Sequence, residues 1–107
     1  MFGFFKKKEM DIAAAEAFWS WYVENDGKLI DMLQARDMGI VNLVDSHISP
    51  VFPYRKNFEF QMGGLVDGKY ELMLFHCGNK YLERDLETLK SMMPAELSDH
   101  ITLVIEK

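Results

Sequence analysis

Apolar residues in the first half of the chain recur at the three- and four-residue spacing of an α-helix. The alanine-rich stretch over residues 10–24 favours a helix, and Asn25-Asp26-Gly27 predicts where it ends. A second helix is expected over residues 28–36. A third is expected from Asp37 or Met38 to Ile48, with Asp37 as its N-cap, although its β-branched residues leave a strand open as the alternative.

The period of the pattern then changes to two, which is typical of β-strands. Apolar and polar residues alternate on both sides of Asp67-Gly68, a pair that predicts a two-residue hairpin turn because both residues tolerate positive φ. Such a turn predicts Met62 opposite Met73 and Phe60 opposite Phe75. A bulge at Gly63-Gly64 would shift the pairing beyond it.

The predicted register sorts the hairpin side chains onto two faces. The first face is wholly apolar and is expected to meet the helices; it carries Phe58, Phe60, Met62, Met73, Phe75 and Cys77. The second face is only partly polar; it carries Leu65, Tyr70, Leu72, Leu74, Glu59, Gln61 and His76. We therefore expect either a helix from the first half of the chain or a second molecule to cover the second face.

An amphipathic helix over residues 81–93 and a strand over residues 101–105 complete the pattern. The order α-α-α-β-β-α-β predicts an α+β fold, with a small antiparallel or mixed sheet and helices packed on it. A length of 107 residues fits one domain, residues 1–107. Residues 1–9 are expected to form a flexible basic and aromatic terminus.

Charge and cysteine content narrow the classes of function. The net charge of −5 argues against a nucleic-acid partner, since domains that bind phosphates carry basic patches. The single cysteine excludes an internal disulfide and gives no sign of an oxidising compartment. No apolar run approaches the roughly 18 residues of a membrane span, so no stable membrane association is expected. The cytoplasm is the expected location.

Cys77 is a candidate nucleophile because it lies where a strand is expected to give way to a helix. His76 is poorly placed to act as its base, since neighbouring residues of a strand point to opposite faces. A thiol hydrolase would need His47 or His100 brought close by the fold. The preferred interpretation is a buried, inert cysteine on the apolar face.

The other titratable residues show no catalytic or metal-binding pattern. Metal-ligand spacing is absent among His47, His76, His100 and Cys77. A solvated helix face is expected for Glu83, Asp85 and Glu87. No catalytic, cofactor-binding or metal-ligating residue is therefore predicted, and no cofactor.

Four aromatic residues fall within little more than one helical turn, over residues 18–22 (FWSWY). They cannot all face one core stripe, so some are expected to meet a second surface, either a loop of this chain or another protomer. The residues predicted to form an interaction surface, from this helix and from the second hairpin face, are Phe18, Trp19, Trp21, Tyr22, Tyr70, Leu72 and Leu74.

The F-W-x-W-Y helix, the Gly78-Asn79-Lys80 step after the hairpin, and the helix and strand that follow resemble a group of small uncharacterised bacterial proteins. Members begin with an F-W-x-W-F/Y helix and end in a comparable strand-helix-strand unit. The resemblance spans most of the chain and implies a bacterial cytosolic protein, but it transfers no catalytic residue. Members extend further at the C-terminus, which implies that this chain is short or truncated there.

The leading hypothesis is a non-enzymatic interaction or regulatory domain that self-associates as a dimer, because sheet edges must be paired or covered. One alternative is a small-ligand-binding domain, with an apolar pocket between the first helix and the hairpin. A further alternative is a thiol-dependent hydrolase that uses Cys77.

Overall fold

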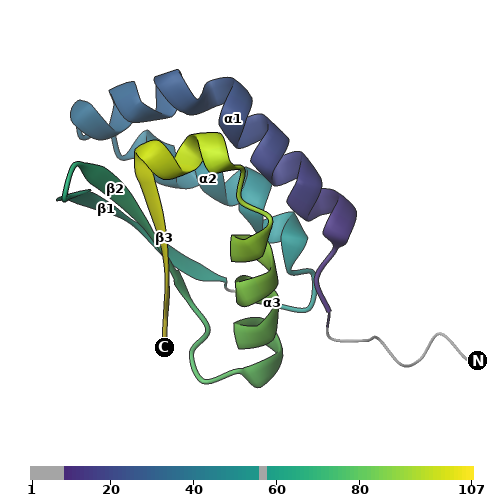
Figure 1. Ribbon diagram of the computed structural model, residues 1–107. Coiled ribbons are helices and arrows are strands. Elements are labelled where there is room, and N and C mark those ends of the chain that lie inside the picture. Colours follow the sequence, from purple (N-terminus) through teal and green to yellow (C-terminus); the bar gives the residue numbers. More distant parts are fainter. Residues whose placement is uncertain (1–8, 56–57) are drawn as a thin grey trace, which may run out of the picture.

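The computed structural model describes residues 9–55 and 58–107, and it confirms the α+β class (Figure 1). The predicted flexible terminus, apart from Glu9, lies outside the described residues. The described part contains, in order, α1 (Ile12–Gln34), α2 (Gly39–Ile48), η1 (Ser49–Val51), β1 (Glu59–Val66), β2 (Lys69–Phe75), α3 (Lys80–Ser91), η2 (Ala95–Asp99) and β3 (Ile101–Glu106). The order contains one helix fewer than predicted.

Helix α1 is continuous through the segment that was expected to end it. The Asn25 side chain donates to the Trp21 carbonyl oxygen at 2.9 Å, so it bonds within the helix and caps nothing. Leu29 is completely buried and continues the apolar stripe one helical turn or more beyond the predicted end. Burial of this second half outweighs the roughly 1 kcal/mol that Gly27 costs inside a helix. The prediction of two separate helices is therefore wrong.

The remaining helices agree with the sequence pattern. The third predicted helix is α2, so the alternative of a strand does not apply. The N-cap of α2 is Met38 and not Asp37, so that prediction is wrong by one position. The Asp37 carboxylate nevertheless accepts a hydrogen bond from the Gly39 amide at 2.9 Å. Helix α3 begins after Asn79, whose side chain accepts hydrogen bonds from the amides of Tyr81 and Leu82. These side-chain oxygens satisfy amides that have no partner within the helix.

The three strands form a mixed sheet in the order β1-β2-β3. Strands β1 and β2 are antiparallel, whereas β2 and β3 are parallel and are connected through α3. The hairpin turn is confirmed, since Asp67 and Gly68 both have positive φ, at 53° and 80°. Figure 1 shows the tip of this hairpin extending beside the C-terminal end of α1.

The bulge at Gly63-Gly64 shifts the pairing of β1 and β2 by one residue. Phe60 pairs with Leu74 and Met62 with Leu72, and the register changes between Met62 and Leu65. The predicted opposition of Met62 to Met73 is therefore wrong, although the position of the bulge is confirmed. A one-residue shift in a sheet exchanges the two faces of one strand relative to its neighbour.

The shifted register places Phe60 and Met62 of β1 on the same face as Leu72 and Leu74 of β2, under the helices. Tyr70, Leu72 and Leu74 belong to the buried core, together with Ile101 and Leu103 of β3. The predicted apolar face is wrong for β2, because Met73 and Phe75 lie on the opposite face. That opposite face is half-buried along its centre and acidic at its margins; it carries Glu59, Gln61, Glu71, Met73, Phe75, Thr102, Val104 and Glu106.

Candidate functional site

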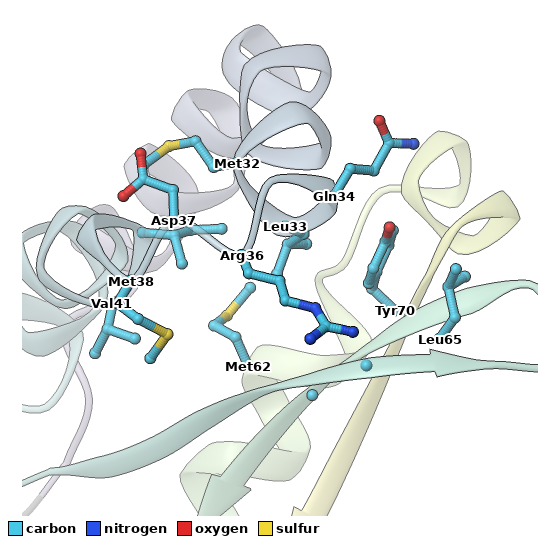
Figure 2. A pocket seen from close by; sticks show the side chains of 13 residues that line it. Met32, Leu33, Gln34, Arg36, Asp37, Met38, Val41, Met62, Leu65 and Tyr70 are labelled. Carbon is cyan, nitrogen blue, oxygen red and sulfur yellow. The ribbon is translucent and has the colours of Figure 1, made fainter.

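An open cavity of about 610 Å³ lies between the turn that joins α1 to α2 and the bulged part of β1. Figure 2 shows side chains from the helices and from the hairpin facing one another across it. The lining residues are Met32, Leu33, Gln34, Arg36, Asp37, Met38, Ile40, Val41, Met62, Gly63, Gly64, Leu65 and Tyr70. Pockets that hold small molecules typically enclose about 300–1,000 Å³, so the volume suits a small ligand.

The turn that forms the upper wall of the cavity is a Schellman-type helix end. The Arg36 amide donates to the Leu33 carbonyl oxygen at 3.2 Å, and the Asp37 amide donates to that of Met32 at 2.9 Å. Arg36 has a φ of 56°, in the left-handed region that glycine usually occupies at this position. The turn thus carries a long cationic side chain at a position where helix ends of this type usually have glycine.

The bulge of β1 forms the facing wall and leaves the cavity open. Gly64 has open space around it, because an added Cβ would meet no atom within 4 Å. Met62 and Tyr70 lie on either side of the glycine pair along the hairpin, and both line the cavity. Gly64 therefore adds no side chain to this open space, whereas a Cβ at Gly63 would meet the Cβ of Glu71 at 3.4 Å.

The cavity combines an apolar interior with a polar mouth. Three methionines, Met32, Met38 and Met62, supply flexible and polarisable walls that can adapt to different ligands. Figure 2 shows the side chain of Arg36 reaching from the α1–α2 turn toward the hairpin, whereas the Asp37 carboxylate points the other way. The described lining residues include no nucleophile paired with a base.

Most of the residues predicted to form an interaction surface are buried inside the single chain. Phe18, Trp19, Tyr22, Leu72 and Leu74 are at most 3% exposed. The indole nitrogen of Trp19 donates to the Leu89 carbonyl oxygen at 3.0 Å and so joins α1 to α3. These residues stabilise the fold, and none of them presents a surface to a partner.

The other two predicted interaction residues lie at the edge of the core. Trp21 is half-buried and stacks on His47, with ring centroids 3.9 Å apart and planes 12° from parallel. Tyr70 is only 9% exposed, yet it lines the cavity. The sequence thus singled out Tyr70, which belongs to the candidate site, but as part of an interaction surface and not of a cavity.

Cys77 is exposed, so the prediction of a buried thiol is wrong. Strand β2 ends at Phe75, and Cys77 lies in the following turn with a φ of 53°. Its sulfur is 3.8 Å from Glu59 Oε2. A thiol hydrolase would need a histidine beside Cys77, but the three histidines have their contacts elsewhere.

Each histidine of the described chain contacts a different group, and none of these groups is the Cys77 thiol. His76 accepts a hydrogen bond from the Gly78 amide at 3.0 Å through Nδ1, and its Nε2 lies 3.7 Å from Glu83. His47 stacks on Trp21, and His100 Nε2 lies 2.5 Å from Asp26 Oδ2. The hydrolase hypothesis therefore gains no support from the geometry.

Asp85 is buried on α3, although a solvated position was expected. Its carboxylate accepts hydrogen bonds from the Tyr54 hydroxyl at 2.5 Å and from Arg84 Nε at 3.0 Å. Burial raises the pKa of Tyr54 well above its usual range, and the hydrogen bond to Asp85 adds to this effect. This contact holds the segment after η1 against α3, and it lies outside the cavity.

Tyr22 is a second buried phenol, and its hydroxyl has no hydrogen-bond partner among the described residues. Burial raises the pKa of Tyr22 far above its ordinary value, and the nearby negative charge of Asp26 raises it further. The ring packs with Phe18 and Trp21, at centroid separations of 5.9 Å and 6.0 Å. Its place is in the aromatic core and not in the candidate site.

Comparison of the chain with models of protein families, with curated proteins and with solved structures finds no match. Residues 9–55 and 58–107 contain no cluster of three or more side chains able to hold a metal ion. None of the helices in this described part is long and apolar enough to cross a membrane. The candidate function therefore depends on the cavity alone.

Proposed function

We propose that this chain is a small-ligand-binding domain, and that the ligand occupies the cavity between the α1–α2 turn and the β1 bulge. The observation that carries the proposal is an open space of about 610 Å³ with an apolar interior and a polar mouth. Such cavities are the usual form of small-molecule sites. We further propose that the domain acts in the bacterial cytoplasm, as its composition and its resemblance to small bacterial proteins imply.

Burial of the residues that were predicted to form an interaction surface favours this proposal over a domain that binds a partner through them. Leu72 and Leu74 are completely buried in the single chain, so they have no exposed area to give to a partner. The cavity, in contrast, is bordered by partly exposed methionines and by Leu65, which is 60% exposed. A bound molecule would cover this apolar area and so gain free energy from its removal from water.

Binding of the neutral dye N-phenyl-1-naphthylamine tests the proposal, since its fluorescence rises in an apolar site. Val41 lines the cavity and is half-buried, so Val41→Phe should fill part of the space. We expect the dissociation constant to rise about tenfold, equivalent to about 1.4 kcal/mol. Circular dichroism and a cooperative urea transition establish that the variant is folded.

Val104→Phe is the matched control. Val104 is also half-buried but lies on the opposite face of the sheet, beside Met73. It should leave dye binding unchanged. The proposal is wrong if the wild-type protein does not enhance the dye fluorescence, or if the two substitutions weaken binding equally.

Self-association remains a second proposal, favoured by the free edge of β1. Among the strands of the described residues, β1 pairs only with β2, and Glu59 is its one charged residue. Met38 and Leu65 near it are 74% and 60% exposed. Edge strands without protective charges tend to pair with a second strand, and a two-fold dimer is the simplest closed arrangement.

Light scattering coupled to size-exclusion chromatography tests the dimer. We expect the mass of two chains at micromolar concentration, and of one chain for Leu65→Lys. Asp67→Lys places the same charge at the hairpin turn and serves as the control. A monomer at every concentration would refute self-association and leave the ligand proposal standing.

A further inference from the structure

We propose that the ligand of this cavity is an amphipathic monocarboxylate, with its apolar body in the methionine-lined interior and its carboxylate on the guanidinium of Arg36. This inference rests on the proposed ligand-binding function and deepens it. It names a chemical class that the volume of the cavity alone does not specify.

The backbone at Arg36 is the first observation that supports the proposal. Its φ of 56° is a conformation that side chains with a Cβ adopt at an energetic cost, and a glycine would adopt it freely. The Schellman-type hydrogen bonds of Arg36 and Asp37 need this conformation but do not need an arginine. Strained residues of this kind cluster at ligand sites, where the side chain has a use that offsets the strain.

The position of the guanidinium is the second observation. Arg36 is the one cation among the described residues that line the cavity. It forms no ion pair with any residue of the described chain. Figure 2 shows its side chain extended toward the hairpin, over the interior that Met62 and Tyr70 border. A guanidinium presents several donors in a fork that matches a carboxylate, and such charge-assisted bonds are among the stronger hydrogen bonds.

The balance of charge favours a single negative group on the ligand. The cavity lining holds one arginine and one carboxylate, that of Asp37, which accepts a hydrogen bond from the Gly39 amide. A ligand with several negative charges would therefore meet too few cations. An uncharged apolar ligand would gain nothing from the guanidinium, because Arg36 is exposed and water solvates it. A monocarboxylate with an aliphatic or aromatic body satisfies both ends of the site.

Isothermal titration with octanoate, 1-octanol and octylamine tests the proposal, because the probes share one apolar chain and differ in the head group. We expect octanoate to bind about tenfold more tightly than 1-octanol, and octylamine to bind most weakly. Arg36→Gln should remove the preference for octanoate and leave 1-octanol binding within about twofold of the wild-type value. Arg36→Lys should keep most of the preference, since it keeps the charge.

Arg36→Gly tests whether a loss of octanoate binding could result from a loss of folding. Glycine suits the backbone at this position, so the variant should unfold at a temperature equal to or above that of the wild type. It should nevertheless bind octanoate no better than 1-octanol. A lower melting temperature together with lost binding would show that Arg36 acts through the fold, and would overturn the assignment.

The outcomes separate this inference from the function on which it rests. If octanoate and 1-octanol bind equally and N-phenyl-1-naphthylamine also binds, the cavity is a ligand site but the carboxylate class is wrong. If neither the dye nor any octyl probe binds, the proposed function itself fails. If the preference for octanoate survives Arg36→Gln, another group holds the carboxylate and the role of Arg36 is refuted.

Discussion

The hydroxyl of Tyr54 donates a hydrogen bond of 2.5 Å to the carboxylate of Asp85, across 31 positions of sequence. Asp85 is only 4% exposed, so this contact satisfies a charged group within the protein interior. Arg84, whose side chain is largely exposed, forms an ion pair with the same carboxylate. The pair therefore fixes the loop that follows η1 to the middle of α3.

Tyr54→Phe is expected to destabilise the protein by about 1–2 kcal/mol, because it leaves the buried carboxylate with one partner fewer. Urea denaturation of Tyr54→Phe, Asp85→Asn and the double variant measures the coupling. We expect the double variant to lose less stability than the sum of the two single changes. Additive losses would show that the two side chains do not interact in solution.

Tyr22→Phe should not destabilise the protein, in contrast to Tyr54→Phe. The Tyr22 hydroxyl is buried and has no partner among the described residues, so it contributes a desolvation penalty and no hydrogen bond. We expect the variant to be as stable as the wild type or up to about 1 kcal/mol more stable. Equilibrium urea denaturation at pH 7 measures the change, and a loss above that amount would reveal a hydrogen bond of this hydroxyl.

The same two phenols predict how stability depends on pH. Burial raises the pKa of both Tyr22 and Tyr54 in the folded chain, whereas tyrosine in an unfolded chain titrates near pH 10. A raised folded pKa contributes stability that is complete below about pH 10 and is lost as the pH rises above it, because only the unfolded chain then releases its phenolic protons. Unfolding free energies measured at intervals between pH 8 and pH 11 should therefore fall at the alkaline end.

Tyr22→Phe provides the control for that pH dependence. Removing one phenol with a raised pKa should make the alkaline loss of stability smaller than in the wild type. An identical alkaline decline in the two proteins would contradict the assigned burial of this hydroxyl.

Gly27→Ala tests whether α1 is continuous in solution. Gly27 lies inside the helix, and an added Cβ would meet no atom within 4 Å. We expect alanine to stabilise the protein by about 0.5–1 kcal/mol, because it lowers the entropy of the unfolded chain and favours the helix. If the helix instead ended here with the glycine at positive φ, the same substitution would be destabilising, and thermal denaturation distinguishes the two.

Local patterns in the sequence were sufficient for most of the secondary structure. The hairpin turn at Asp67-Gly68, the amphipathic stripe of α3 and the last strand all depend on neighbours in the chain, and all three were predicted. The end of α1 was not, because burial of Leu29 against distant elements decides it. The Asn25-Asp26-Gly27 signal is local and was overridden by packing.

The faces of the sheet could not be predicted with the same success. One extra residue in the bulge exchanges the faces of β1 and β2, and its effect on Leu72 and Leu74 depends on where the pairing resumes. The two faces therefore had to be seen in the assembled sheet. Burial of Asp85 was equally hidden, since its partner Tyr54 comes from a distant segment.

The candidate site was only partly visible in the sequence. A pocket between the first helix and the hairpin was one of the alternatives, and the cavity lies there. Arg36 gave no signal, because an arginine at the end of a helical pattern is ordinary, and only the backbone shows its positive φ. A helix end without a glycine or asparagine at the following position is the one clue that could have marked it.

The central claim is that a small ligand binds between the α1–α2 turn and the hairpin, and methyl NMR of the methionines tests it most directly. Of the eight methionines in the chain, Met32, Met38 and Met62 line the cavity, whereas Met73 lies on the opposite face of the sheet. Single Met→Leu substitutions assign each methyl signal in protein labelled with 13C at the methionine methyl groups. Titration with N-phenyl-1-naphthylamine should shift the signals of Met32, Met38 and Met62 and leave that of Met73 in place. Unmoved signals from the three cavity methionines, or a larger shift at Met73, would contradict the account.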